Sequence, residues 1–320
     1  MLKKFREDNT SKKINFLEHQ WWEENADIIE RVWEMDYEIS SKVRKNYINN
    51  ARNFFKKGNQ KVTILEIGCG SGWVGQMLAG ANLHIIGTDF SKSQIALAKK
   101  NAKKRKLGKF TKYYVLDSSH WPKETQIDGI LIHAFLHHLD NQEIEHLFLE
   151  LKKRFKKGTK IWIYEPTFYR ILRKKKIEIS LETKLLLKIA VYFAVILEEI
   201  YNKKNILKKE KIEKFLELQQ TAVKEEWYLS PKEIPFDLNE FSHKLKKYFR
   251  VENHYWATIY LIGWVAKINL IKNKLLKKIV TNLFLPLFIL ADKKICLEKD
   301  YLKSILVYPN YAFHVWECKI

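Results

Sequence analysis

The stretch Ile64–Gly75, with the sequence ILEIGCGSGWVG, constrains the fold more than any other part of the chain. An apolar run leads into four closely spaced glycines. Glycine allows a sharp backbone turn and a close approach of the backbone to a ligand. In open parallel sheets, such a turn joins a buried strand to a helix, and ligands bind outside the carboxyl ends of the strands. The stretch therefore predicts a strand, a ligand-binding turn and a helix, in that order.

Short apolar runs then alternate with helical patterns as far as Pro166. The predicted strands are residues 62–67, 83–87, 113–116, 130–132 and 161–164. The predicted helices between them are 74–78, 91–106 and 142–155. This alternation indicates right-handed crossover units, and the continuous apolar strands fit a sheet covered on both faces. We expect an α/β fold with a Rossmann-like, seven-stranded, mostly parallel sheet and helices on both faces.

The pattern divides the chain into three regions. The pattern predicts an N-terminal helical cap over residues 1–57 and the Rossmann-like core over residues 58–166. Residues 167–320 predict a helical elaboration that also holds the last core strands, near 249–256 and 311–320.

The elaboration carries much of the net charge of +21. Arg170–Lys214 has 13 basic and 6 acidic residues, and Lys267–Lys303 has 9 and 3. Both segments also contain apolar runs, so residues 168–225 and 259–307 predict basic, partly apolar helices. These helices fit solvated faces over a core, a lipophilic pocket or an anionic membrane surface. Nucleic acid is disfavoured as a partner because the basic residues alternate with aliphatic rather than aromatic side chains.

Several kinds of segment are missing from the sequence. The N-terminus turns polar at once, unlike a signal peptide, and no window reaches the ~18–20 apolar residues of a membrane span. The cysteines Cys69, Cys296 and Cys318 are too few and too far apart for a disulfide framework or a zinc cluster. We therefore expect no metal and a cytoplasmic location.

Three acidic residues at or near the ends of predicted strands distinguish between ligands. Asp89 ends the second strand, where its carboxylate can accept both hydroxyls of a ribose. Glu66 would repel a pyrophosphate but could help to hold an ammonium group, and Asp117 could accept from an adenine amino group. The segment Gly70–Gly75 also fits the pattern GxGxxG, so an NAD-type oxidoreductase remains an alternative. The acids favour a ligand with adenosine at one end and a cationic group at the other.

From about residue 60 to 166, the chain resembles a class I S-adenosylmethionine-dependent methyltransferase of the small-molecule type. The motifs that carry the resemblance are Leu65–Gly72 (LEIGCGSG), Gly87–Ser91 (GTDFS), Leu116–Ser118 (LDS), Ile127–Leu139 (IDGILIHAFLHHL) and Lys152–Pro166 (KKRFKKGTKIWIYEP). The resemblance implies S-adenosylmethionine as the cofactor and S-adenosylhomocysteine as the product.

The resemblance also implies positions for the cofactor. The residues that it places around the methionine end are Glu66, Gly68, Cys69, Gly70 and Gly72. It places Asp89 at the ribose, Phe90 against the adenine, Asp117 and Ser118 at the adenine edge, and His133 near the sulfonium.

Methyl transfer from a sulfonium is an in-line displacement with a neutral leaving group, so the main tasks are alignment and desolvation. A general base is needed only when the acceptor carries a proton at neutral pH. His137 and His138 are the candidate bases, with helix packing as the alternative role.

We expect transfer to an O, N or C atom of a small lipophilic acceptor, and a peripheral association with an anionic membrane surface. The alternative from another class is a non-catalytic, membrane-associated or partner-binding module that keeps this fold.

Overall fold

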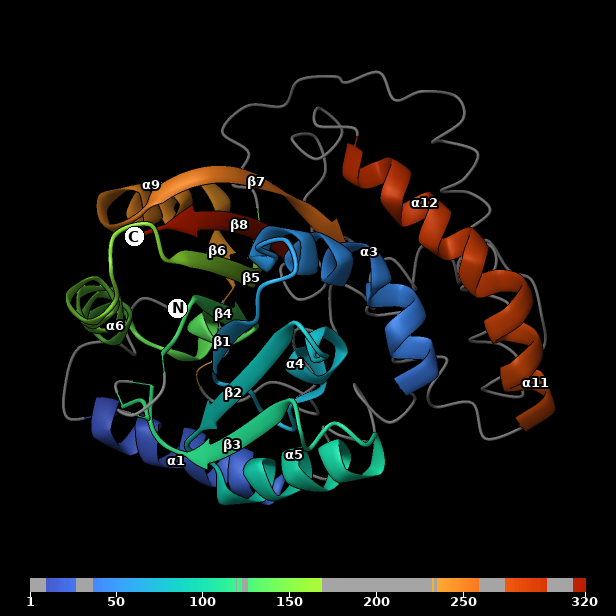
Figure 1. Ribbon diagram of the computed structural model, residues 1–320, viewed down its shortest axis with the longest axis horizontal. Helices are drawn as coiled ribbons and strands as arrows, with labels where there is room; N and C mark the ends of the chain where they lie inside the picture. The colour runs from blue at the N-terminus through green and yellow to red at the C-terminus, as the bar shows by residue number, and fades with distance from the viewer. Residues whose placement is uncertain are drawn as a thin grey trace.

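The computed structural model describes residues 10–26, 37–118, 120–122, 126–168, 232, 235–258, 274–297 and 313–320. Its centre is one sheet with the strand order β3-β2-β1-β4-β5-β8-β7, and β6 pairs with β5 beside this path (Figure 1). The strands are β1 (Val62–Ile67), β2 (Leu83–Asp89), β3 (Thr111–Val115), β4 (Gly129–His133), β5 (Lys160–Phe168), β6 (Phe236–Asp237), β7 (Arg250–Thr258) and β8 (Phe313–Lys319). Since β2 and β4 lie on opposite sides of β1, the carboxyl ends of β1 and β4 form a switch point.

The strand directions match the predicted class. β1 pairs in parallel with β2 and β4, β2 with β3, and β4 with β5. β8 runs antiparallel to both of its described neighbours, β5 and β7. The α/β class with a mostly parallel sheet is therefore confirmed. The two-residue β6 is an additional strand, too short to produce a periodic pattern in the sequence.

Helices pack on both faces of the sheet (Figure 1). The helices are α1 (Thr10–Glu24), α3 (Tyr37–Phe55), α4 (Trp73–Leu78), α5 (Lys92–Lys104), α6 (Asn141–Arg154), α9 (Leu238–Tyr248), α11 (Lys274–Ile279) and α12 (Leu285–Leu297), with the 3₁₀ turn η3 (Leu136–His138) and the π segment η4 (Val280–Phe284). One core cluster joins α3 and α4 to Leu131 and Trp162, and another joins α6 and α9 to Ile130 and Ile132. Adjacent residues of β4 thus enter different cores, as the pleat of a strand requires.

The regions outside the core are described only in part. The helical region predicted over 168–225 lies outside the described residues, apart from the end of β5. β7 and β8 occupy the positions of the two late strands, while the division into cap, core and elaboration stays a prediction. α11, η4 and α12 follow one another without a break inside the predicted helical region 259–307. None of the helices in the described ranges is long and apolar enough to cross a bilayer.

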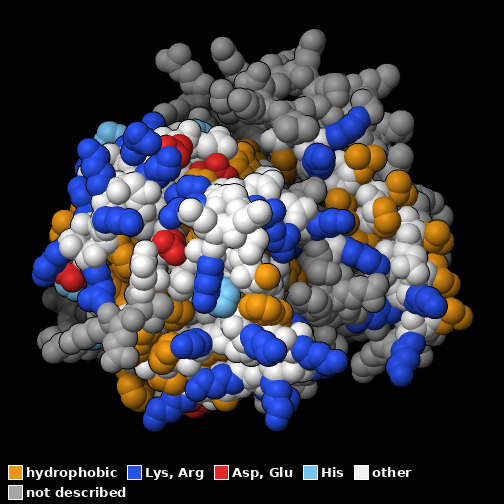
Figure 2. Space-filling view, in the orientation of Figure 1, with side chains coloured by type: hydrophobic (Ala, Val, Ile, Leu, Met, Phe, Trp, Pro, Cys, Tyr) orange, Lys and Arg blue, Asp and Glu red, His pale blue; other side chains and the backbone are white. Residues whose placement is uncertain are grey.

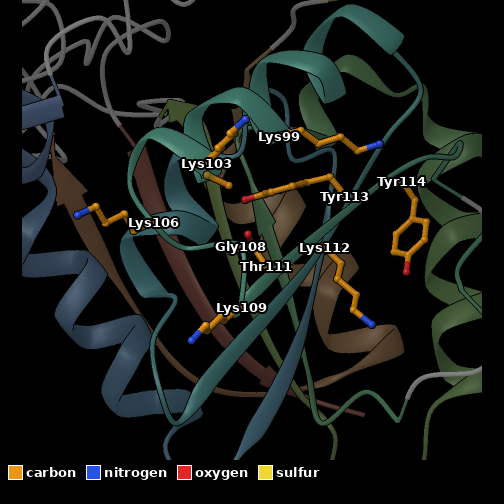
Figure 3. Close-up of a pocket in the computed structure, with 10 residues that line it drawn as sticks. Lys99, Lys103, Lys106, Gly108, Lys109, Thr111, Lys112, Tyr113 and Tyr114 are labelled. Atoms are coloured by element: carbon orange, nitrogen blue, oxygen red, sulfur yellow. The ribbon is translucent and has the colours of Figure 1, made fainter.

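The β3 edge of the sheet is strongly basic. Five lysines line a hollow of 580 Å³ between α5 and β3, where Tyr113 also lies (Figure 3). They are Lys99, Lys103, Lys106, Lys109 and Lys112. Lysines at a sheet edge oppose pairing with a strand of another chain, and this role explains the lysines of the β3 edge.

The start of β4 gives a stability prediction. A Cβ atom at Gly129 would lie 2.7 Å from two atoms of the Phe55 ring, and this ring is 1% exposed. We expect Gly129→Ala to lower the free energy of unfolding by about 1–3 kcal/mol through overpacking, measured by urea denaturation.

The matched control is Gly108→Ala, because nothing lies within 4 Å of a Cβ atom at Gly108. Equal stabilities of the two variants would contradict this packing of α3 on β4.

Candidate active site

The glycine loop after β1 uses its glycines for different reasons. Gly68, Gly70 and Gly72 have φ angles of 65°, 51° and 75°, a region that side chains rarely adopt. A Cβ atom at Gly68 would lie 2.2 Å from the Phe135 ring, and one at Gly72 would lie 2.8 Å from Tyr113. At Gly70 the nearest atom would be 3.7 Å away. Packing therefore requires the outer two glycines, while open space beside Gly70 lets a ligand approach the backbone.

Glu66 lies beneath this loop rather than among the residues that line the open space. Its side chain is buried, and Oε1 accepts a hydrogen bond from the Gly75 amide at 3.2 Å. Burial raises the pKa of Glu66 to about 8, and the charge of Asp89 adds to this rise. A Cβ atom at Gly75 would lie 2.2 Å from Oε2 of Glu66. The last glycine of the GxGxxG pattern thus makes room for a carboxylate.

Cys69 is part of the packing between the loop and α5. Its side chain is buried against Ile95, Ala98 and Tyr113, and its amide donates to the Thr88 carbonyl at 2.9 Å.

Asp89 connects the loop to the start of α5. Its Oδ2 accepts from the Gly70 amide and its Oδ1 accepts from the Ser91 amide, both at 2.9 Å. Ser91 then caps α5 by accepting from the Gln94 amide. Burial raises the pKa of Asp89, although these amides favour its ionised form. Each carboxylate oxygen keeps a second lone pair, so Asp89 can also accept from ribose hydroxyls.

A cleft of 260 Å³ lies over the switch point. Its lining includes five of the predicted cofactor residues, Gly68, Asp89, Phe90, Asp117 and Ser118, and the candidate base His138. The predicted residues outside its lining are Glu66, Cys69, Gly70, Gly72, His133 and His137.

The edge of the cleft is formed by Asp117. Its carboxylate oxygens lie 2.8 and 2.9 Å from Nδ1 of His120. Because more than half of the Asp117 side chain is exposed, it can still meet a ligand at this edge.

Helix α1 closes the other side of the cleft. The His19 ring stacks on Phe90 with ring centroids 3.9 Å apart. Glu23 accepts a hydrogen bond from the Ser91 hydroxyl at 2.5 Å and another from the Ser93 hydroxyl at 3.0 Å. The sequence did not predict these contacts, because no pattern in α1 indicates which strand end it meets.

A buried carboxylate orders the turn after β4. Glu165 accepts from the amides of Phe135 and Leu136 at 2.9 and 2.7 Å, and it lies 2.7 Å from Nδ1 of His137. Burial raises the pKa of Glu165 to about 7 and lowers that of His137 to about 3. His137 is therefore a neutral imidazole at neutral pH, held by Glu165 and outside the cleft lining.

His138 faces the cleft and contacts α1. Its Nδ1 lies 3.0 Å from Glu18, which also accepts from the Trp22 indole at 2.8 Å. The Trp22 ring meets the His138 ring edge-on, with centroids 5.0 Å apart.

His133 belongs to an aromatic cluster on the α3 side of the switch point. We define this aromatic cluster as Tyr47, Trp73, His133, Trp162 and Tyr164. The rings of His133 and Tyr164 stack at 4.2 Å, as expected for residues paired in neighbouring strands. The Arg44 guanidinium lies 3.6 Å above the Trp73 ring. Burial, together with the positive charge of Arg44, lowers the pKa of His133 well below its usual range.

Comparison with known families identifies the core. Residues 64–158 match the family model for a methyltransferase domain. This part of the chain is a methyltransferase domain. A search of curated protein sequences gives no match to the chain.

Solved structures share the fold at low sequence identity. The mycolic acid cyclopropane synthase CmaA1, solved with S-adenosylhomocysteine and CTAB, is 11% identical with a TM-score of 0.53, covering 88% of this chain and 85% of its own. The (4+2)-cyclase SpnF is 12% identical with a TM-score of 0.51, covering 94% of both chains. Geranyl diphosphate C-methyltransferase from Streptomyces coelicolor A3(2) is 10% identical with a TM-score of 0.50, covering 94% of this chain and 86% of its own. These likenesses establish the fold alone.

The residues at the cleft fit S-adenosylmethionine chemically. Gly70 leaves the backbone accessible, Asp89 offers carboxylate oxygens to a ribose, and Asp117 and Ser118 offer polar atoms at the cleft edge. The aromatic ring of Phe90 lies between them, already stacked on one side by His19.

Asp89 gives a binding prediction. We expect Asp89→Asn to weaken S-adenosylhomocysteine binding about tenfold to a hundredfold, because an amide cannot accept from two backbone amides and a ribose at once. Isothermal titration calorimetry measures the change.

Asp128→Asn is the matched control. Asp128 also accepts from a backbone amide, that of Thr63 at 2.9 Å, but it lies at the amino ends of β1 and β4, away from the cleft. Equal affinities of the two variants for S-adenosylhomocysteine would show that Asp89 does not contact this ligand.

Glu66 gives a pH prediction. Between its ordinary pKa of 4.5 and its folded-state pKa of about 8, the folded chain holds a proton that the unfolded chain has lost. The contribution of Glu66 therefore lowers the free energy of unfolding as the pH rises through this window. In Glu66→Gln, we expect this fall to be smaller than in the native chain, measured by urea denaturation across the window.

Glu24→Gln, at an exposed position of α1, should keep the native pH dependence. A Glu66→Gln curve parallel to the native one would show that Glu66 does not titrate in this range.

Proposed function

We propose that the methyltransferase transfers the methyl group of S-adenosylmethionine to a small lipophilic acceptor that the aromatic cluster binds. The observation that carries this proposal is the set of buried polar atoms within the cluster. Oη of Tyr47, Oη of Tyr164 and Nε2 of His133 make no hydrogen bond of normal geometry in the described part of the chain, although the two hydroxyl groups interact with each other. They come from α3, β4 and β5 and converge at the carboxyl end of β4.

The lack of hydrogen bonds is an argument for a ligand. A buried polar group without a partner costs about 1–3 kcal/mol, so a chain seldom keeps several of them together without a use. Tyr47 and Tyr164 lie 4.8 Å apart between ring centroids, and their hydroxyl groups influence each other's pKa, which burial raises in both. A hydroxyl, amine or carboxyl group of an acceptor would satisfy these atoms.

The surroundings of Tyr47 support a lipophilic acceptor. Tyr47 also lines a pocket of 590 Å³ between α3, β7 and α12, within the usual range for small-molecule sites. Apolar and aromatic residues, among them Val43, Phe54 and Ile289, form much of its lining, beside polar side chains such as Asn50. Two proteins of similar fold are named for mycolic acid and geranyl diphosphate, which favours the same substrate class.

The chain's own residues have three tasks in this reaction. Glu165 fixes the turn that carries Phe135 against Gly68, and so holds the loop in place. The aromatic cluster excludes water around the acceptor, which strengthens electrostatic interactions there. Nε2 of the neutral His133 imidazole can accept a hydrogen bond from an O–H or N–H group of the acceptor. S-adenosylmethionine supplies the activated methyl group.

The partner and location predictions stay proposals. A lipophilic acceptor would be met at a membrane, which fits a cytoplasmic chain that binds a membrane peripherally.

The tyrosine hydroxyls provide the first test. We expect Tyr47→Phe and Tyr164→Phe each to lower kcat/KM for the acceptor about tenfold or more, because each removes one hydrogen bond made only with bound acceptor. S-adenosylhomocysteine affinity should not change. The melting temperature should stay close to the native value, because each variant keeps its aromatic ring in the cluster.

Tyr248→Phe is the matched control, because Tyr248 packs on Phe148 and Phe249 on the other face of the sheet. Native activity in both cluster variants would overturn this acceptor site.

The acceptor is found by incubating the methyltransferase with methyl-labelled S-adenosylmethionine and fractionated cell extract. We expect the label in the lipid-soluble fraction. Label in protein, RNA or polar metabolites would contradict a lipophilic acceptor. Cofactor binding without any transfer would point to a non-methylating use of the fold.

A further inference from the structure

The outward side of the helix formed by α11, η4 and α12 is unusually apolar. Half of the exposed large apolar side chains in the described ranges lie on this one helix. We call them the outer stripe: Leu275, Ile279, Leu283, Leu287 and Leu290, which are 70%, 41%, 62%, 42% and 47% exposed. Figure 2 shows apolar and basic side chains mixed at the edge of the molecule where Figure 1 places this helix. A contiguous patch of this kind marks an interaction surface more often than a solvated face.

The π segment η4 keeps the outer stripe on one side. Residues spaced by four drift around an α-helix, because one turn takes 3.6 residues. Over Leu275, Ile279, Leu283 and Leu287 this drift would turn successive side chains further around the helix axis, out of a straight row. The wider turns of η4, over Val280–Phe284, compensate for the drift between them. This position for a rare π segment keeps a straight apolar row exposed.

The charge beside the outer stripe is of one sign. Lys274, Lys278 and Lys293 are exposed on the same helix. The one acidic residue among the described positions 274–297, Asp292, is buried at 4% exposure. The lysines therefore flank aliphatic side chains without exposed carboxylates between them.

The opposite side of the helix is seated on the protein. Val280 and Leu285 are buried, and Ile289 and Cys296 line the pocket shared with α3 and β7. The helix thus has a fixed inner side and a free outer side, so the outer stripe is presented in a defined direction.

We propose that the outer stripe docks onto the surface of a bilayer that contains anionic lipids. Aliphatic side chains flanked by lysines match the boundary between acyl chains and anionic headgroups, where an amphipathic helix lies in the plane of the interface. An acidic protein partner would match the lysines but not a straight row of five aliphatic side chains. The lysine hollow beside β3 lacks such a row, so it serves as an internal comparison.

This docking stands apart from the proposed function, because the stripe faces away from the aromatic cluster and requires no particular acceptor. It adds a location for a lipophilic acceptor, since the pocket on the inner side of α12 would lie next to the bilayer.

The test is cosedimentation of the full chain with vesicles of phosphatidylcholine, with or without phosphatidylglycerol. We expect binding to the anionic vesicles that weakens with added salt. Leu283→Asp combined with Leu287→Asp should lower the partition coefficient about tenfold or more, because charges replace buried aliphatic groups. Lys274→Glu combined with Lys278→Glu should lower binding to the anionic vesicles by a similar factor.

The matched control is Lys103→Glu combined with Lys109→Glu, which changes charge equally in the β3 hollow and should bind as the native chain does. All variants should keep the native melting temperature and S-adenosylhomocysteine affinity, so failure of docking and failure of the methyltransferase site are separate results. The proposal is overturned if the native chain stays in the supernatant or the stripe variants still bind. It is also overturned if the leucine variant turns a vesicle-free dimer into a monomer, because a second copy would then cover the stripe.

Discussion

The active site depends on one buried carboxylate, that of Glu165. It accepts from two consecutive backbone amides, of Phe135 and Leu136, and it holds the His137 ring, so the turn after β4 has a single arrangement. That turn presses the Phe135 ring against Gly68, where no Cβ atom would fit. The loop between β1 and α4 is thereby fixed in the form that brings the Gly70 amide to Asp89. Removing Glu165 would leave three donors without an acceptor at the centre of the sheet, which is costlier than the loss of a surface charge.

Two more carboxylates accept hydrogen bonds from backbone amides in the same way. Asp89 holds the Gly70 and Ser91 amides, and Glu66 holds the Gly75 amide from below. Glu66 and Asp89 stand at the carboxyl ends of the adjacent strands β1 and β2, and Glu165 follows the last residue of β5 that pairs with β4. Free amide groups of loops and helix starts are concentrated in these places. Two of the acids that the sequence presents as ligand contacts, Glu66 and Asp89, therefore support the loops. Asp89 alone of the three also lines the cleft, so it can do both.

The sequence predicted what depends on neighbours along the chain. Apolar runs and glycines gave the five parallel strands and the turn after β1, because their causes lie within a few residues. It placed Asp89, Phe90 and Asp117 at strand ends that the fold then brings to one cleft. It could not predict that His19 would stack on Phe90, or that Tyr47 would meet Tyr164, since helix docking depends on distant surfaces. The same limit applies to His133: its strand position was predictable, but the side of the sheet on which it packs was not.

The cleft, the aromatic cluster and the outer stripe follow one another from the switch point toward the outward side of α12. The cleft lies on one side of the carboxyl end of β4, and His133 lies at that end with its ring on the other side. From His133 the cluster continues to Tyr47, which lines the pocket against α12. The outward side of α12 carries part of the apolar row. A lipophilic acceptor leaving a bilayer at this helix would therefore meet aliphatic, then aromatic, then polar groups. Under the proposed function, the aromatic cluster would desolvate the acceptor beside the switch point, and desolvation and alignment are the main requirements of a methyl transfer.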